Sequence, residues 1–152
     1  MADVHFRPAR RDELPAIVAL LADDIFGRSR ESALPTLDPR YVAAFTAITA
    51  DPNQQLVVAL DGDAVIGTLQ LSFLPGISHL GSWRGQVEGV RIASARRGEG
   101  LGEAMMAWAV AACRARGCSH VQLTTDRQRT DAHRFYDRLG FKPSHLGYKL
   151  AL

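Results

Sequence analysis

The sequence predicts an α+β protein with a mixed central β-sheet of six to seven strands flanked by about four helices. In the first half of the chain, short apolar and β-branched runs come as hairpin pairs, whereas the second half alternates strand, helix and strand. Hairpins make antiparallel neighbours and a strand–helix–strand crossover makes a parallel pair, so one sheet of both kinds is expected rather than a doubly wound one. A length of 152 residues suits one domain, residues 1–152, with one core.

Local patterns place the elements of the first half. Asp12 and Asp38 stand where they would cap helices, and Pro39 takes the first position of the second helix. Asp61-Gly62-Asp63 is a hairpin signal between two apolar runs. The polar stretch 23–39, interrupted by glycine and proline, is expected to be a surface loop. The expected strands are 4–7, 55–60 and 64–73, and the expected helices are 14–21 and 39–50.

The second half begins after the break at Pro75-Gly76. Apolar residues at helical spacing predict a long helix at 101–116, with Met105, Met106 and Trp108 in the core, and Gly117 ends it. Gly140 ends a further helix in the same way. The expected strands are 86–93, 119–125 and two final pieces, 141–142 and 146–150, and the last helix is 130–139.

Composition and charge exclude several classes of protein. Apolar residues make up 47% and charged residues 22%, as in ordinary soluble domains and unlike disordered or collagen-like chains. A net charge of +2 is too small to indicate nucleic acid. The longest uncharged stretch, 64–83, contains glycines and a proline and is no membrane span, and residues 1–5 carry no apolar signal segment. The expected location is therefore the cytoplasm, with no membrane or nucleic-acid partner.

The two cysteines, Cys113 and Cys118, are expected to be reduced core and loop residues. No second cysteine pair exists to complete a zinc site, so no metal is expected.

The segment 87–103 carries the strongest chemical signal. A strand runs into a turn with three glycines, Gly98–Gly102, and then into a helix. Glycines let a ligand approach the backbone, and a helix N-terminus offers unpaired N–H groups with partial positive charge. Arg96 and Arg97 stand beside the turn. The pattern predicts a phosphate or pyrophosphate site, with a plain tight turn as the alternative. A dinucleotide fingerprint fails because residue 103 is Glu, and no Gly-Lys-Ser/Thr of a P-loop is present.

Arg97 to Gly102 (Arg-Gly-Glu-Gly-Leu-Gly) resembles motif A, Gln/Arg-x-x-Gly-x-Gly/Ala, of the GNAT superfamily of acetyl-CoA-dependent N-acetyltransferases. Ala132 to Phe141 is similar to the family's Ala-x-x-Leu/Phe-Tyr-x-x-x-Gly-Phe, and the two motifs stand in the family's order. Shorter stretches within 122–145 resemble aminoalkylphosphonate N-acetyltransferases, and Val87 to Val90 resembles glucosamine-phosphate N-acetyltransferases.

The resemblance implies the GNAT fold, in which the strands 86–93 and 119–125 splay apart to hold acetyl-CoA, the acetyl donor. The pantetheine arm would pair with the strand backbone at Val90 and Ile92, and the pyrophosphate would lie on the amides of the glycine turn. At Arg129 the family often has asparagine. The acetyl-CoA contacts expected from the resemblance are Val90, Arg91, Ile92, Arg97, Gly98, Glu99, Gly100, Leu101, Gly102 and Asp131.

Two residues are candidates for catalysis. The resemblance implies that Tyr136 gives a proton to the departing CoA thiolate; a tyrosine packed in the core is the alternative. An ammonium group must lose a proton before its nitrogen attacks a thioester. Glu88 is the candidate base that accepts this proton, either directly or through a water molecule. A carboxylate that only binds the amine or an arginine is the alternative. In a regular strand, the side chains of Glu88, Val90 and Ile92 point to the same face. A bulge at Gly89 would insert an extra residue and turn Glu88 to the face opposite Val90 and Ile92.

Other polar residues are weaker candidates. Arg127, Arg129 and Asp131 form a polar cluster after a strand, suited to hold substrate or cofactor, although Asp131 equally suits the first turn of a helix. His145, beside Ser144, is expected either to line the acceptor pocket with Arg127 and Glu88 or to lie on the surface. His133 is expected on the surface of the last helix.

The function expected from this resemblance is acetyl transfer from acetyl-CoA to a primary amine of a small molecule, by direct attack in a ternary complex. Neither cysteine lies in a motif, which disfavours a covalent acyl-enzyme. One alternative acceptor is a protein N-terminus or lysine, and a second alternative is a non-catalytic CoA-binding regulatory module. Family likeness favours a homodimer.

Overall fold

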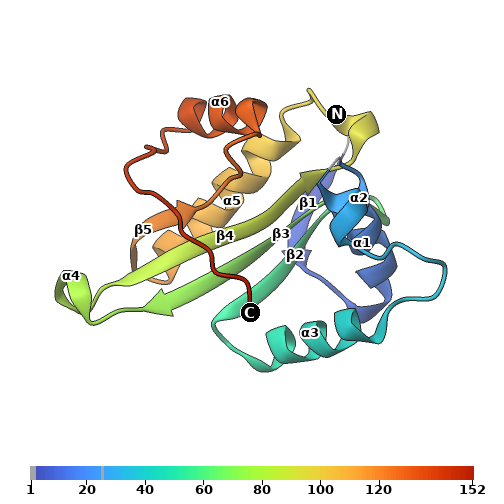
Figure 1. Ribbon diagram of the computed structural model, residues 1–152, viewed down its shortest axis with the longest axis horizontal. Helices are drawn as coiled ribbons and strands as arrows, with labels where there is room; N and C mark the ends of the chain where they lie inside the picture. The colour runs from blue at the N-terminus through green and yellow to red at the C-terminus, as the bar shows by residue number, and fades with distance from the viewer. Residues whose placement is uncertain (1–2, 25) are drawn as a thin grey trace. The chain divides into compact units, whose positions relative to one another are not determined.

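The computed structural model describes residues 3–24 and 26–152, so predictions that involve Met1, Ala2 and Ile25 lie partly outside it (Figure 1). Its residues group into a first compact unit that ends at Gln122 and a second, Leu123–Leu152. One domain over the whole chain stays a prediction. The elements are β1 (Val4–Pro8), a 3-10 turn (Arg11–Glu13), α1 (Leu14–Ala22), α2 (Gly27–Arg30), α3 (Pro39–Ala50), β2 (Gln54–Asp61), β3 (Ala64–Pro75), α4 (Ser78–Gly81), β4 (Trp83–Ile92), a second 3-10 turn (Ser94–Arg96), α5 (Leu101–Ala115), β5 (Cys118–Leu123) and α6 (Thr130–Arg138).

One mixed sheet has the strand order β1-β2-β3-β4-β5. From β1 to β4, each strand runs antiparallel to the next. β5 runs parallel to β4, because Ser119 bonds to Trp83 and Gln122 bonds to Gln86, both across the same offset of 36 residues. Antiparallel partners could not keep a constant offset. The α+β class is confirmed, but the sheet of the described residues has five strands rather than six or seven.

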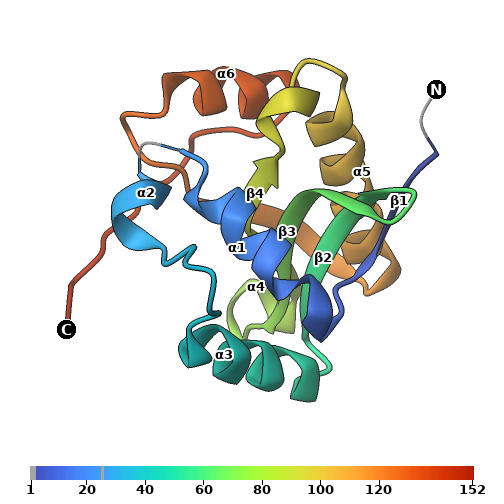
Figure 2. The ribbon, with the colours of Figure 1, turned by 90° about the vertical axis from the view of Figure 1, so that its right-hand side faces the viewer.

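Helices pack on both faces of the sheet. Figure 2 shows α1 on one side of β2 and β3 and α5 on the other. Met105, Met106 and Ala109 of α5 are buried, and Trp108 lies half-buried with its ring 6.4 Å from that of Phe6. On the opposite face, apolar residues of α1, α3 and β2 form a cluster whose buried members are Leu14, Ile17, Val58 and Leu60.

Apolar side chains therefore pack on both faces of β2, which fixes its register, while on the α1 face β3 carries the polar Thr68, Gln70 and Ser72. None of the described helices is long and apolar enough to cross a membrane.

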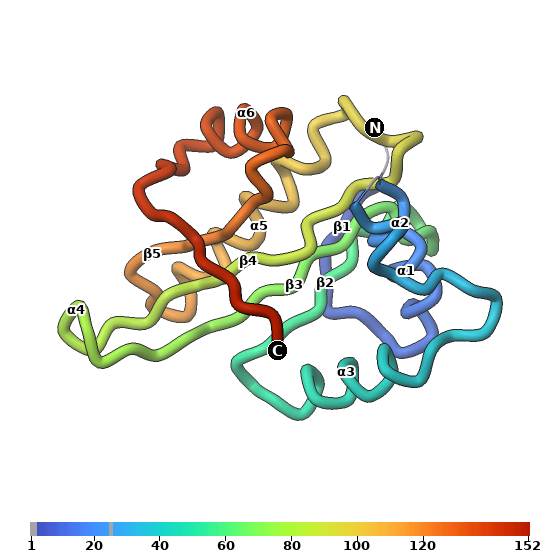
Figure 3. Tube along the Cα trace, in the orientation of Figure 1, coloured from blue at the N-terminus to red at the C-terminus, as the bar shows by residue number. Residues whose placement is uncertain are grey.

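The hairpin of β3 and β4 is longer than predicted. In Figure 3 the two strands run side by side to the turn at α4, and their pairing reaches Pro75 and Trp83. At the tip, His79 and Leu80 have φ values of 56° and 59°, in the left-handed region. β3 thus continues to Pro75, whereas the predicted strand ended at residue 73.

The predicted cap at Asp38 is confirmed, whereas that at Asp12 is wrong. Asp38 Oδ1 accepts from the Arg40 backbone N–H at 2.9 Å, and hydrogen bonds from Arg40 lower the Asp38 pKa to about 2. Asp12 lies inside a 3-10 turn, and α1 begins at Leu14. The turn places Asp12 ahead of the helix start, and Glu13 at its end accepts from the Arg10 N–H at 2.7 Å and pairs with Arg7. Its longer side chain can fold back onto the preceding turn.

The loop predicted at 23–39 includes one further short helix, α2. The two strand pieces predicted at 141–142 and 146–150 are absent from the described residues, which follow α6 as turn and irregular chain. Alternating apolar residues favour an extended backbone, but a strand exists only where its N–H and C=O groups pair. Leu146, Tyr148 and Leu150 are 69%, 89% and 86% exposed.

The cysteines are free thiols, and Cys113 is buried where α5 meets the sheet. Burial raises the pKa of the Cys113 thiol to about 11, and the Cys118 thiol beside it adds to the shift. Gly85 of β4 lies directly beneath this thiol: a Cβ placed at Gly85 would collide with Cys113 Sγ and lie 3.3 Å from its Cβ. The absence of a side chain at residue 85 therefore lets α5 approach the sheet.

Replacing Gly85 with alanine is expected to destabilise the fold by about 1–3 kcal/mol, the usual cost of overpacking. Removing the colliding sulfur in Gly85→Ala/Cys113→Ala is expected to recover most of that loss relative to Cys113→Ala alone. Urea unfolding of the wild type, both single variants and the double variant measures the coupling. Additive single effects would contradict this account of the contact.

Candidate active site

An extra residue in β4 sets the directions of the side chains around Glu88. Gln70 of β3 pairs with Glu88 and Thr68 pairs with Arg91, so β4 advances three residues while β3 advances two. Gly89 has a φ of 62°, which favours glycine. Glu88 and Arg91 consequently share one face of the sheet, while Val87 and Ile92 share the other. The bulge considered from the sequence is present, and it removes the common parity of Glu88, Val90 and Ile92.

β4 extends beyond the end of its parallel neighbour. β5 ends at Leu123, which at the offset of 36 residues stands beside Val87. Residues 88–92 therefore have no β5 residue beside them. Such an edge can pair with an extended ligand as an added strand. Part of it is already bonded, since the Val90 carbonyl accepts from Arg91 Nη1 at 2.8 Å.

Glu88 is exposed and its carboxylate is bonded to an amide rather than to an arginine. Gln86 Nε2 donates to Glu88 Oε1 at 2.7 Å. Gln122 Nε2 in turn donates to Gln86 Oε1 at 2.9 Å. The same face of the sheet carries Gln54, whose Oε1 accepts from Ser72 Oγ at 2.7 Å. The sheet surface around Glu88 is therefore rich in neutral hydrogen-bonding groups.

The Arg91 side chain anchors the segment between α1 and α2. Its Nη2 lies 3.0 Å from Asp24 Oδ2, and both side chains are 15% exposed. Asp24 also accepts from the backbone N–H of Gly27, the first residue of α2. Any contact of Arg91 with a cofactor would therefore come from its backbone.

The glycine turn has the shape of a cradle. Gly98 and Gly100 have φ values of 83° and 78°, and the space where their Cβ atoms would lie is open. Gly100 is the N-cap of α5 and offers no side chain to the first N–H groups of that helix. Leu101 is buried and fixes the start of the helix, while Gly102 follows it in the first turn. The turn thus presents backbone donors at the N-terminus of a 15-residue helix.

The two arginines beside this turn have different surroundings. Arg96 bonds to Asp61 at 2.8 Å and to Glu99 at 2.9 Å, and these bonds raise its pKa. It ties the turn to the end of β2. Arg97 is exposed, and its Nε lies 3.4 Å from the Ile92 carbonyl oxygen. Arg97 is thus better placed than Arg96 to meet an anion, and Glu99 would contact one through its backbone.

The second unit contains Tyr136, on α6. Its half-buried ring lies 5.0 Å from the ring of Phe135 and 5.8 Å from that of Phe141. The Phe141 N–H donates to the Tyr136 carbonyl at 3.1 Å, just after Gly140 ends the helix with a φ of 90°. The conformation that ends the helix therefore holds the aromatic group together.

The remaining predicted site residues of this unit are surface residues. Arg127 is exposed, and Asp131 pairs with Arg134 in the first turn of α6, the structural role considered for it. His145 is exposed, with its Nδ1 2.7 Å from Ser144 Oγ. Arg129 is the N-cap of α6. His133 Nε2 lies 2.9 Å from the Asp126 carbonyl oxygen and so closes the turn before α6.

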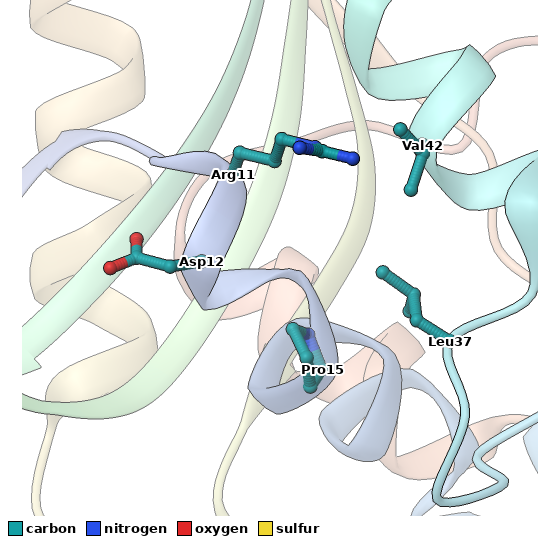
Figure 4. Close-up of a pocket in the computed structure, with 5 residues that line it drawn as sticks. All are labelled: Arg11, Asp12, Pro15, Leu37 and Val42. Carbon is teal, nitrogen blue, oxygen red and sulfur yellow. The ribbon is translucent and has the colours of Figure 1, made fainter.

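A surface hollow of about 320 Å³ lies elsewhere, between the first 3-10 turn, α1 and α3. In Figure 4, Arg11 reaches toward Val42 with Leu37 nearby, while Asp12 points away. None of the predicted site residues lines this hollow, which is lined by Arg11 and Asp12 beside Pro15, Leu37 and Val42.

Sequence reasoning missed Gln86, Gln122 and Asp24. Gln86 stands two residues before Glu88, so strand alternation could have placed both on one face. Gln122 joins them only through the register of β4 and β5, which no local pattern specifies. Asp24 meets Arg91 only because the bulge turns that arginine to the α1 side.

Comparisons with known proteins agree with this architecture. Residues 19–141, more than half of the chain, match the model of the acetyltransferase (GNAT) family. An aminoalkylphosphonate N-acetyltransferase of Salmonella typhimurium is 34% identical over 108 residues, which cover 71% of this chain and 70% of that protein.

Two solved structures show the same fold. A transcriptional regulator from Bacillus halodurans is 46% identical, with a TM-score of 0.95 over 98% of this chain and 99% of that one. Glucosamine-6-phosphate N-acetyltransferase from Arabidopsis thaliana is 18% identical, with a TM-score of 0.79 over 97% of each chain; this likeness concerns the fold alone.

Proposed function

The chain belongs to the acetyltransferase (GNAT) family, and from that premise we propose that it transfers an acetyl group from acetyl-CoA to the primary amine of a small molecule. That it is an acyltransferase follows from the family; the donor and the acceptor are the proposal. The observation that carries the proposal concerns β4: the same strand holds the exposed Glu88 carboxylate and an open edge that leads into the glycine turn.

The glycine turn fits a pyrophosphate. Gly98 and Gly100 leave space for oxygens against the backbone, the N-terminus of α5 supplies donors and partial positive charge, and Arg97 adds a full charge. Residues 90–92 of β4 suit the extended arm of the same ligand through their backbone. Asp131 stays a cofactor contact predicted from the resemblance.

The proposed chemistry needs one base and one acid. Glu88 takes a proton from the substrate ammonium, and the freed nitrogen lone pair attacks the thioester carbonyl carbon. A C–N bond forms, the C–S bond breaks, and its electron pair goes to sulfur. Tyr136 gives that sulfur a proton and, as the phenolate, regains one from the nitrogen, which must lose a second proton to become a neutral amide; the products are free CoA thiol and the acetylated amine. The attack is direct: Cys113 is buried and protonated at neutral pH, so it is no acyl carrier.

The acceptor is proposed to be small and polar as well as cationic. Glu88 would attract the ammonium, and the neutral amides around it would bond hydroxyl or carbonyl groups. Arg127 and His145 are proposed to bind the rest of the acceptor. The Salmonella relative acts on aminoalkylphosphonates by its name, and such anionic amines suit these two basic residues. The homodimer expected from the resemblance stays a prediction.

A panel of amines tests the function. Aminoalkylphosphonates, amino-sugar phosphates, simple diamines and a peptide with a free N-terminus are each incubated with acetyl-CoA, and the released thiol is measured. Saturable release with a small amine, together with a product heavier by one acetyl group, is expected. Release only with the peptide would favour the protein acceptor instead.

A regulatory module that binds CoA without turnover is a second candidate, favoured by the 46% identity to a structure described as a transcriptional regulator. The exposed Glu88 and the retained Tyr136 argue against it. Tight CoA binding without thiol release across the whole panel would favour this candidate.

Gly100→Val is expected to weaken CoA binding at least tenfold, because a branched side chain is strained at a positive φ and fills the cradle. Calorimetry measures the affinity. Gly117→Val is the matched control: it has a φ of 75° and equally open surroundings, but it lies at the other end of α5. Equal losses in both variants, or an unchanged affinity in folded Gly100→Val, would refute the cradle.

Glu88→Gln is expected to lower kcat/KM at neutral pH and to leave the affinity for acetyl-CoA nearly intact. General-base catalysis is commonly worth about 10²–10⁴-fold. The acidic limb of the kcat/KM profile is expected to change, since a glutamine does not titrate. Asp63→Asn, an exposed carboxylate in the β2–β3 turn, is the control. A full rate with an unaltered profile would reduce Glu88 to a structural residue.

Tyr136→Phe keeps the aromatic packing and removes only the proton donor. A fall in kcat of about 10²-fold is expected, the lower end for acid catalysis, because a thiolate is a fair leaving group unaided. The Tm should change little. Tyr148→Phe, at an exposed tyrosine, is the control for loss of a hydroxyl. If Tyr136→Phe kept more than about half of kcat with chemistry rate-limiting, Tyr136 would be only a wall of the site.

A further inference from the structure

Three side chains on one face of the sheet form a chain of hydrogen bonds that ends at Glu88. Gln122 of β5 donates to Gln86 of β4, and Gln86 donates to Glu88 two residues further along β4. We call Gln122 and Gln86 the glutamine relay. Both relay residues are half-buried, whereas Glu88 is exposed. The relay therefore connects the packed part of the sheet to the carboxylate that the proposed function uses.

The relay has a defined direction. A primary amide has an accepting end and a donating end, and Gln122 supplies a donor to the carbonyl oxygen of Gln86. The NH₂ group of Gln86 consequently faces Glu88. The flipped amide would set oxygen against the carboxylate and NH₂ against NH₂, losing both bonds. The carboxylate only accepts, so it requires the NH₂ end of Gln86, and Gln122 supplies the matching donor to the other end.

The bond from Gln86 makes the two oxygens of Glu88 different. Oε1 accepts the amide hydrogen at 2.7 Å, and within the described residues Oε2 has no donor. An exposed glutamate otherwise samples several rotamers, and a charge-assisted hydrogen bond restricts them. Because β4 and β5 are in fixed register, the relay can hold this orientation before the substrate arrives.

We propose that Gln86 is a positioning residue that holds the Glu88 carboxylate so that Oε2 receives the proton of the substrate amine, and that Gln122 positions Gln86. The proton leaves the ammonium nitrogen for Oε2, and the nitrogen keeps the lone pair that attacks the thioester. This inference rests on the proposed function, since it assigns a role in the same proton transfer.

Gln86→Leu, Gln86→Glu and Gln122→Leu test the relay with the amine that the panel identifies. Gln86→Leu removes a bond to a charged group, so kcat/KM is expected to fall roughly 3- to 30-fold. Gln86→Glu should lose more, since it sets a carboxylate against a carboxylate, and Gln122→Leu should lose less. KM for acetyl-CoA should not change.

The decisive comparison repeats Gln86→Leu in the Glu88→Gln background. A residue that acts through Glu88 should cause little further loss there. Gln55→Leu, a half-buried glutamine that pairs with Leu71 on the opposite face of the sheet, is the control for general effects on the fold. A full rate in Gln86→Leu, or the same loss in both backgrounds, would overturn the proposal.

A readout without turnover separates this inference from the proposed function. In an amide NMR spectrum, the Gln86 side-chain NH₂ resonance should move in Glu88→Gln and stay in place in the control Asp63→Asn. If the resonance is the same in the wild type and in Glu88→Gln, the relay is wrong even in an active enzyme. If the resonance responds but no amine is acetylated, the proposed function fails while the relay bond stands, and its catalytic role falls with the function.

Discussion

The bulge at Gly89 is the constraint on which the arrangement of the candidate site depends. In a regular strand, Glu88 and Arg91 would point to opposite faces. The extra residue brings Arg91 to the face that carries α1 and Glu88, where Arg91 can pair with Asp24. Only glycine adopts the φ of 62° at residue 89 without strain. One backbone irregularity thus lets Arg91 pair with Asp24 on the face where strand alternation places Gln86 and Glu88.

The strand that carries this bulge also connects the two proposed halves of the chemistry. Its edge beyond Val87 has no β5 residue beside it, and it leads through the turn framed by Arg96 into α5. Gly85, near its start, lets Cys113 pack close and so fixes α5 against the sheet. Donor binding and deprotonation of the amine are therefore proposed to depend on positions along one strand and the helix that follows it, whereas Tyr136 of α6 would protonate the leaving thiolate.

Much of the fold could be predicted from the sequence, because local signals specified it. Asp38 and Pro39 fixed the start of α3, Asp61-Gly62-Asp63 fixed the hairpin, and Gly117 fixed the end of α5. The predictions that failed depended on which neighbour a side chain bonds and on whether a strand finds a partner. Asp12 falls inside a 3-10 turn in which Glu13 bonds back to Arg10, and the alternating pattern after Lys142 could not reveal whether a partner strand exists. For the site, Glu88 and the glycine turn were visible as motifs, but Gln122 required the register of two strands 36 residues apart.

The central claim is that the edge of β4 and the glycine turn together hold the acetyl donor, and an NMR titration with CoA tests it most directly. Backbone amide resonances of a ¹⁵N-labelled protein are followed as CoA is added. The account predicts that the largest shifts fall on residues 90–92 and 97–102, with little change in β1 and β2. Saturable CoA binding that leaves both of those segments unshifted, and that moves resonances elsewhere in the sheet, would contradict it.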